Sequence, residues 1–216
     1  MSKKAYRGQD LDVMFDLKRC IHAAECGKRL QAVFDVKKRP WVQPDNAAAN
    51  EVAATIEQCP SGALTYSRHD GGAEEAVSTN NTILIMDSGE YRIRGNVALT
   101  TMTGESLASE HRLTLCRCGE SKNKPFCDNS HREAGFAAPS SVVDNVAETA
   151  DLQPTGSFKI MPATNGPLLL QGNFEIHDQS GQHIFRGTKA ALCRCGNSAS
   201  KPFCDGTHKA IGFEAP

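Results

Sequence analysis

The sequence predicts an α+β protein in which a small α/β domain, residues 1–68, precedes two β-rich repeats, residues 82–137 and 157–216. Three observations lead to this prediction. The nine cysteines fall into three groups of three, with none left over. The second and third groups lie in two copies of one segment, offset by 77 residues. Apolar residues follow helical spacing in part of the first domain, whereas strand-like alternation dominates after residue 81.

Composition excludes several classes of protein. The 216 residues include 24 basic and 25 acidic side chains, with a formal net charge of -1 at pH 7. This balance argues against a nucleic acid partner, because a polyanion requires a basic surface. No apolar run approaches the roughly 20 residues that span a bilayer, and no apolar segment follows the first lysines as in a secretory signal. We therefore expect a soluble, cytoplasmic protein with no membrane partner.

The number of cysteines points to metal sites. Cysteines of a protein in a reducing compartment are more often metal ligands than disulfide partners. Nine is also an odd number, so the cysteines cannot all pair within one chain. Metal would in addition stabilise short units that bury little apolar surface of their own.

The first domain shows short periodic segments. Val52, Ile56 and Cys59 fall at positions i, i+4 and i+7, which predicts a helix that Pro60 ends. The expected elements, in chain order, are an edge strand over 12–18, a helix over 25–31, a turn into a strand over 37–41, a helix over 50–58 and a return strand over 63–66.

Cys20, Cys26 and Cys59 form an incomplete four-iron signature. A four-iron ferredoxin supplies Cys-x2-Cys-x2-Cys and a remote Cys-Pro. Cys20 and Cys26 take the first and third places, Cys59 takes the remote one, and Ala23 stands where the middle cysteine is expected. Three thiolates fit a [3Fe-4S] cluster, or a [4Fe-4S] cluster whose fourth iron takes another ligand, for which His22 is the candidate. The alternative is three structural thiols in a small core.

Residues 10–67 resemble the divergent 4Fe-4S monocluster ferredoxin family. The resemblance rests on the cysteine spacing and on the helix and strand order around it. It implies a ferredoxin-like fold with one cluster, held by Cys20, Cys26 and Cys59.

The other six cysteines belong to an internal duplication. The segment CRCGESKNKPFCDNSH runs from Cys116 to His131, and CRCGNSASKPFCDGTH runs from Cys193 to His208. Between residues 91–136 and 168–213, 17 of 46 positions are identical. Each copy is therefore a repeat of roughly 55 residues. The expected strands are 82–86, 91–99 and 110–116 in the first copy, and 159–163, 168–176 and 187–193 in the second. Connectors are expected over 68–81 and 138–156.

Each copy offers four metal ligands in two pairs. The spacing Cys-x-Cys-x8-Cys-x3-His places two thiolates on an extended arm, where the intervening Arg117 points away. A thiolate and an imidazole follow on a second arm, next to a helical turn for which Asp128 is the expected N-cap. Such pairs suit a binuclear iron–sulfur centre or one tetrahedral zinc. The candidate ligands are Cys116, Cys118, Cys127 and His131, then Cys193, Cys195, Cys204 and His208.

Both copies resemble the CDGSH iron–sulfur (mitoNEET-like) family, through the pattern C-x-C-x2-S-x3-P-x-C-D-x-[ST]-H. The resemblance implies one [2Fe-2S] cluster per copy, held by three cysteines and one histidine. Asn129 stands where the family usually has glycine, and the second copy has Gly206. Family members with one motif pair as homodimers, so the resemblance implies a monomer whose two repeats form an internal pseudo-dimer under a shared β-rich cap.

These predictions combine into a soluble protein with three clusters that transfers electrons to a redox partner protein. We do not expect an enzyme, because no GxGxxG, phosphate loop or Ser/His/Asp set stands apart from the ligands. The alternative is a cluster donor to an apo-acceptor protein, or a redox or pH sensor, since a protonated histidine cannot bind iron.

Overall fold

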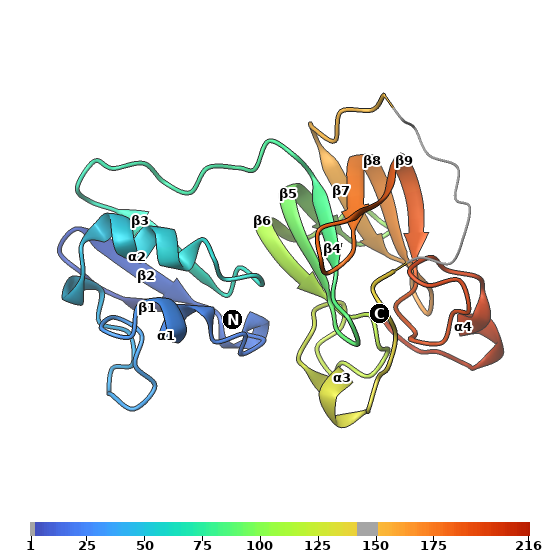
Figure 1. Ribbon diagram of the computed structural model, residues 1–216, viewed down its shortest axis with the longest axis horizontal. Helices are drawn as coiled ribbons and strands as arrows, with labels where there is room; N and C mark the ends of the chain where they lie inside the picture. The colour runs from blue at the N-terminus through green and yellow to red at the C-terminus, as the bar shows by residue number, and fades with distance from the viewer. Residues whose placement is uncertain (1–2, 142–150) are drawn as a thin grey trace. The chain divides into compact units, whose positions relative to one another are not determined.

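The computed structural model describes residues 3–141 and 151–216, and the chain divides into two compact units (Figure 1), residues 1–76 and 77–216. Part of the connector expected over 138–156 lies outside the described residues. Within the described ranges, every helix is too short or too polar to cross a membrane.

The first unit contains a three-stranded antiparallel sheet in the order β1-β2-β3. The strand expected at the edge, β2 (Leu11–Phe15), is instead the central one, between β1 (Lys4–Tyr6) and β3 (Leu64–Arg68). That prediction was wrong because only Tyr6 of β1 is buried, so β1 shows no alternation in the sequence. The strand also ends early, because the Asp16 carboxylate accepts from Lys18 N–H and starts the 3-10 turn η1 (Leu17–Arg19).

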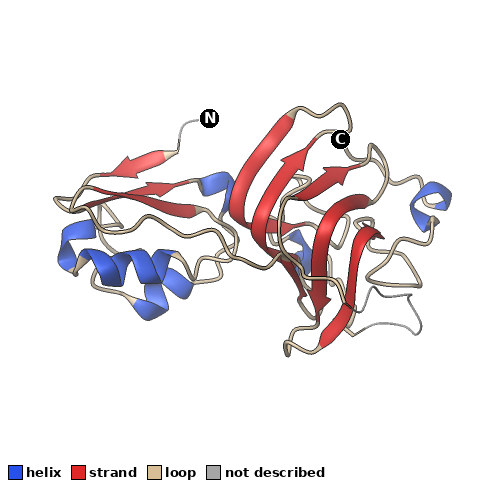
Figure 2. Cartoon of the chain, turned by 90° about the horizontal axis from the view of Figure 1, so that it is seen from above, coloured by secondary structure: helices blue, strands red, loops and turns tan. Residues whose placement is uncertain are grey.

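Helices α1 (Glu25–Arg29) and α2 (Ala49–Ile56) lie on one face of this sheet (Figure 2) and confirm the two predicted helices. A further 3-10 turn, η2 (Pro44–Asn46), precedes α2. The strand expected after residues 37–41 is reduced to a single bridge between Phe34 and Val42. The buried apolar core comprises Tyr6, Leu11, Val13, Val33, Phe34, Val42, Val52, Ala53, Ile56, Leu64 and Tyr66.

The second unit is built mainly of strands, and both copies contribute three. All six predicted strands are present, and the last strand of each copy begins four residues before the predicted start. The strands are β4 (Thr82–Ile85), β5 (Tyr91–Thr100), β6 (Ser106–Leu115), β7 (Phe158–Pro162), β8 (Leu168–His177) and β9 (His183–Leu192). The short helices α3 (Ser130–Glu133) and α4 (Thr207–Ala210) lie beyond one end of the sheet (Figure 1).

The two repeats complete one another's sheet. Strand β4 pairs antiparallel with β5 of its own repeat and parallel with β8 of the other. Strand β7 likewise pairs antiparallel with β8 and parallel with β5. The strands β6 and β9 extend the sheet from β5 and β8. One continuous core results, and it includes Ile83, Ile85, Tyr91, Leu99, Leu113, Leu115, Phe158, Ile160, Leu170, Phe174, Ile176 and Leu192.

The duplicated Gly-Asn pairs mark a bulge in each long strand. The pairing register shifts across Gly95 in β5 and across Gly172 in β8. Both glycines have positive φ, and a Cβ on Gly95 would lie 2.3 Å from Asn81 Oδ1. Asn81 uses that oxygen to accept from Asn96 N–H at 3.0 Å. The bulge therefore needs glycine both for its backbone conformation and for the space that Asn81 fills.

Candidate metal centres

Cys116 and Cys118 follow directly from the end of β6, and Cys127 returns beside them. Cys116 N–H donates to Pro125 O at 2.9 Å, and Cys127 N–H donates to Thr114 O at 3.0 Å. The second copy repeats these bonds, from Cys193 to Pro202 O at 2.8 Å and from Cys204 to Ala191 O at 2.8 Å. The backbone thus fixes both arms of each ligand set.

Each predicted ligand pair comes together. The sulfurs of Cys116 and Cys118 are 3.8 Å apart, and Cys127 Sγ lies 3.6 Å from His131 Nδ1. In the second copy the sulfurs of Cys193 and Cys195 are 3.6 Å apart, and Cys204 Sγ lies 3.3 Å from His208 Nδ1.

The other residues of the motif hold the loop between the two arms. Ser121 Oγ donates to Phe126 O at 2.7 Å, and Lys124 Nζ donates to Ser121 O at 2.7 Å. Asp128 accepts from Lys122 N–H at 2.8 Å and from Ser130 N–H at 3.0 Å. The same bonds recur in the second copy through Ser198, Lys201 and Asp205.

Asp128 is not the N-cap of α3, as the sequence had suggested. The N-cap is Asn129, in the left-handed conformation with φ of 72°, and its side chain makes no capping bond. The Asp128 carboxylate lies one residue earlier and links the helix entry to the ligand loop. Gly206 takes the same conformation in the second copy, with φ of 90°.

The donor set fits a bound metal centre. Burial raises the pKa of Cys127 to about 12, and the contact with Cys116 together with burial raises the pKa of Cys118. Thiols with a raised pKa stay protonated at neutral pH, but a bound metal ion deprotonates them outright. Two backbone N–H groups already face the sulfurs, from Glu120 to Cys118 and from Asn129 to Cys127, each at 3.4 Å. Hydrogen bonds to sulfur are typical of iron–sulfur sites.

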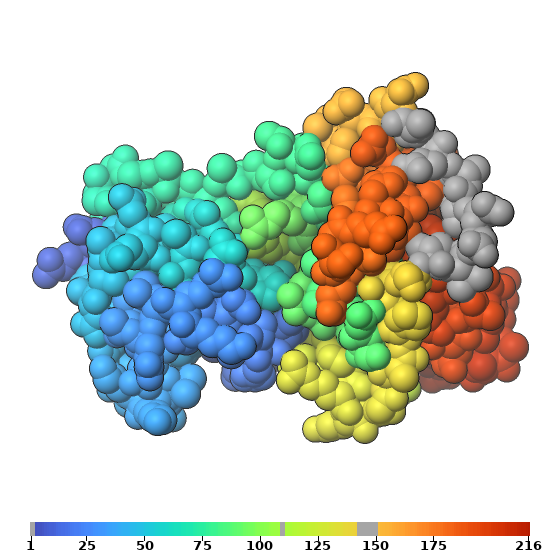
Figure 3. All heavy atoms as spheres, viewed as in Figure 1, coloured from blue at the N-terminus to red at the C-terminus, as the bar shows by residue number. Residues whose placement is uncertain are grey.

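A buried arginine lies between the first two cysteines of each copy. Arg117 and Arg194 are each 1% exposed. Arg117 points away from the sulfurs, as predicted, and donates to the carbonyls of Met86, Ala138 and Pro139 at 3.0, 3.3 and 2.5 Å. The loop after β4 and the segment after α3 thereby lie side by side (Figure 3).

The ligand loops of the two copies touch through their glycines. A Cβ on Gly119 would lie 2.6 Å from Cys195 O, and a Cβ on Gly196 would lie 2.3 Å from Cys118 O. Both glycines have positive φ, +88° and +82°. The two centres are therefore neighbours, with the backbone of one ligand loop packed on that of the other.

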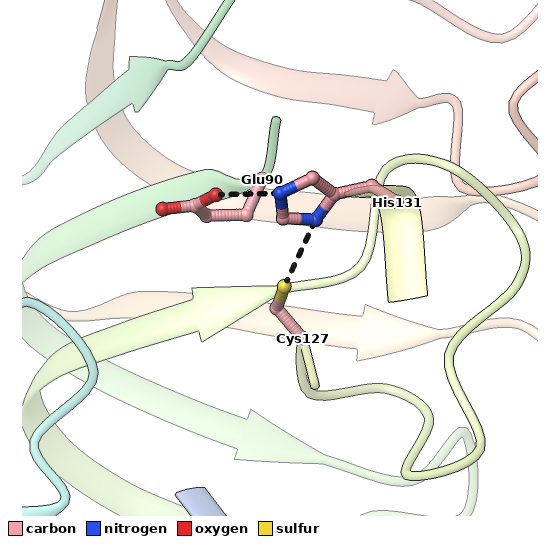
Figure 4. A group of neighbouring side chains, drawn as sticks. All are labelled: Glu90, Cys127 and His131. Atoms are coloured by element: carbon pink, nitrogen blue, oxygen red, sulfur yellow. Dashed lines mark hydrogen bonds and ion pairs between the residues drawn. The ribbon is translucent and has the colours of Figure 1, made fainter. Parts of the chain in front are cut away.

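Glu90 adds a carboxylate to the first centre (Figure 4). Its Oε2 lies 3.9 Å from His131 Nε2, and its Oε1 accepts from Arg92 Nε at 2.8 Å. The ligand atoms of Glu90, Cys127 and His131 lie within 4.8 Å of one another. A hollow of about 450 Å³ opens beside them, lined in part by Arg132. Glu90 was not among the predicted site residues, because Pro167 occupies the corresponding position of the second copy and the duplication therefore gives no signal there.

In the first unit, Cys20, Cys26 and Cys59 are close enough to influence one another. Burial raises the pKa of Cys20 and of Cys26, and a charge on Cys59 raises both further. The loop before α1 is strained, with φ of 50° at His22 and 61° at Ala24. His22 is exposed, and its Nδ1 lies 3.9 Å from Cys20 Sγ.

Comparison with known proteins matches both units. A family described as divergent 4Fe-4S mono-cluster matches residues 6–69, and the family described as iron-binding zinc finger, CDGSH type, matches residues 88–132 and 165–209. The chain is a tandem CDGSH protein with an amino-terminal divergent 4Fe-4S monocluster domain. It is thus an iron–sulfur protein.

The first domain of this tandem CDGSH protein has a relative in Escherichia coli K12, named "Uncharacterized protein YjdI". The two are 38% identical over 66 residues, which cover 31% of the tandem CDGSH protein and 86% of the relative. The protein of the same name from Escherichia coli O157:H7 gives the same figures.

Proposed function

We propose that the tandem CDGSH protein is an electron carrier with three clusters: one [2Fe-2S] cluster in each repeat and one [3Fe-4S] or [4Fe-4S] cluster in the first unit. The ligands are the eight duplicated cysteines and histidines, together with Cys20, Cys26 and Cys59. When bound, the clusters supply one-electron chemistry, and the protein sets their potential and exposure. Its partner is a redox protein, and it is not itself an enzyme.

The contact between Gly119 and Cys195, repeated between Gly196 and Cys118, carries this proposal. Two donor sets whose ligand loops pack on each other suit passage of an electron between neighbouring centres. The exchanged pairings of β4 and β7 support a monomer in which the repeats act as an internal pseudo-dimer under a β-rich cap. The three-stranded sheet with α1 and α2 on one face supports a ferredoxin-like fold for the first unit.

Metal analysis with a redox titration tests the proposal. Two [2Fe-2S] clusters and one of three or four irons give seven or eight irons per chain, with acid-labile sulfide. Dithionite should reduce the clusters, and ferricyanide should reoxidise them without loss of iron. Zinc without sulfide would refute the proposal in favour of two zinc sites.

A second function, cluster donation, is favoured by the exposure of the second repeat. Cys204 and His208 are half-buried, whereas Cys127 and His131 are 3% and 7% exposed. A donor should pass iron and sulfide to an apo-ferredoxin when the two are mixed. A carrier should remain intact in the same mixture while it exchanges electrons.

A further inference from the structure

The imidazole of His131 lies between a thiol and a carboxylate. Its Nδ1 faces Cys127 Sγ at 3.6 Å, and its Nε2 faces Glu90 Oε2 at 3.9 Å (Figure 4). Glu90 is 5% exposed and is oriented by Arg92, whose Nε donates to Oε1 at 2.8 Å. The nitrogen on the sulfur side is thus placed for the metal, and the outer nitrogen is placed for the carboxylate.

The second repeat cannot reproduce this arrangement. The position that corresponds to Glu90 is Pro167, and the position that corresponds to Arg92 is Leu169. Neither side chain can carry a charge to His208. His208 and Cys204 are also more exposed than their counterparts in the first repeat.

We propose that Glu90 makes the two CDGSH centres unequal, so that the centre of the first repeat has the lower reduction potential and retains its iron longer. The inference rests on the proposed function, because it requires a cluster in each repeat. Glu90 is a positioning residue, which acts on the centre through His131.

Two effects of Glu90 act in the same direction. A carboxylate beside the outer nitrogen fixes the imidazole and raises its basicity as a ligand, which stabilises the oxidised, more positive metal. A negative charge in surroundings of low dielectric also opposes the arrival of an electron. The greater exposure of the second centre favours its reduced state, because water stabilises the added charge. The two effects of Glu90 and the greater exposure of the second centre therefore all make the reduction potential of the second centre higher than that of the first.

The expected size follows from other metal sites in which a carboxylate supports a histidine ligand. Loss of such a partner costs about 10- to 100-fold in metal affinity or activity. We expect iron to leave the second repeat at least tenfold faster than the first. A tenfold preference of the oxidised over the reduced state corresponds to about 59 mV for a one-electron couple.

The experiment uses the full chain with its clusters, titrated anaerobically with dithionite and followed by electron paramagnetic resonance. Each [2Fe-2S] centre takes up one electron from dithionite. Two waves are expected from these centres, and Cys127→Ser should remove the lower one, whereas Cys204→Ser should remove the higher. Release of iron to an excess of chelator, followed by visible absorbance, should be biphasic, with the slow phase absent from Cys127→Ser.

Two variants of opposite sign then test Glu90 itself. Glu90→Gln should raise the lower potential and speed the slow phase about 10- to 100-fold. Arg92→Gln removes the compensating cation and should lower that potential further. Glu105→Gln is the matched control, because it removes an exposed acid of the same repeat, in the turn between β5 and β6, and should change neither quantity.

The possible failures are distinguishable. A single wave, or equal shifts of both waves in Glu90→Gln and Arg92→Gln, would overturn this inference and leave the three-cluster carrier standing. A purified protein without iron and sulfide would overturn the proposed function and this inference with it.

Discussion

Replacing Gly119 with alanine tests the contact between the ligand loops of the two repeats. The new Cβ would lie 2.6 Å from Cys195 O and 2.9 Å from its carbonyl carbon. Gly206 offers a matched control, because its φ of +90° resembles the +88° of Gly119, yet no atom of the described residues lies within 4 Å of its Cβ position. The two substitutions share the backbone strain and differ only in the clash.

The magnitude follows from these two terms. A left-handed residue with a Cβ costs roughly 1–2 kcal/mol, which applies to both variants. At Gly119 the Cβ must also separate two backbones, and overpacking of this kind costs about 1–3 kcal/mol. We therefore expect about 2–5 kcal/mol for Gly119→Ala and about 1–2 kcal/mol for Gly206→Ala. Gly206→Asn should cost less again, since Asn129 occupies that position in the first repeat with φ of 72°.

Urea denaturation of the full chain, followed by the visible absorbance of the clusters, measures the difference. With an m-value of roughly 2 kcal/mol/M, the extra 1–3 kcal/mol shifts the midpoint by about 0.5–1.5 M. Gly119→Ala should also weaken the magnetic interaction between the two reduced centres. Equal midpoints for Gly119→Ala and Gly206→Ala would refute the packing of one ligand loop on the other.

Three further predictions concern the ligands and their support. Cys59→Ser should remove the iron of the first unit and leave the visible spectrum of the two repeats unchanged, as metal analysis and absorbance would show. Arg194 donates to the carbonyl oxygens of Ala163, Gly166 and Pro216. Arg194→Gln should lower the free energy of unfolding in urea by about 3 kcal/mol or more, because hydrogen bonds to a charged group contribute about 1.5–3 kcal/mol each. Arg132→Gln, at an exposed position, should change it by no more than about 0.5 kcal/mol. Protons compete with iron for an imidazole, so the absorbance of both repeats should decay as the pH falls. Burial lowers the pKa of His131, so its centre should persist to a lower pH than an ordinary histidine allows. Replacement of both His131 and His208 with cysteine should abolish this decay, and an unchanged rate would show that they are not ligands.

The ligand pairs could be predicted from the sequence because they are local. Cys116 and Cys118 are two residues apart directly after β6, and His131 lies four residues after Cys127 across the tight turn at Asn129. Each pair is therefore brought together by local backbone geometry. The strands could be predicted equally well, because the alternation of apolar and polar residues in the sequence matches the alternation of buried and exposed positions, as in β5.

Contacts between distant segments could not be predicted in this way. The parallel pairings of β4 with β8 and of β5 with β7 join different repeats, and no local pattern specifies them. Glu90 precedes His131 by 41 positions, so nothing in the spacing connects the two. Aspartate is a residue type that often caps helices, which favoured Asp128, but the left-handed Asn129 is the N-cap and the helix starts one residue later than predicted. Tertiary packing decided the strand pairings and the position of Glu90, and a local left-handed residue decided the helix start.

In a symmetric dimer of identical subunits, every contact between the subunits occurs twice. Two repeats in one chain can differ in sequence, so a contact can be made at one centre and be absent at the other. The Tyr91 hydroxyl, from the first repeat, donates to Cys193 O of the second at 2.8 Å and lies 3.2 Å from Pro202 O. The position that corresponds to Tyr91 is Leu168, which has no donor to return the contact. A strand of the first repeat therefore braces the ligand loop of the second, while Glu90 acts only on the first centre. In the carrier proposed above, each centre would therefore be tuned by residues found in only one copy, and such tuning would give an electron a preferred centre.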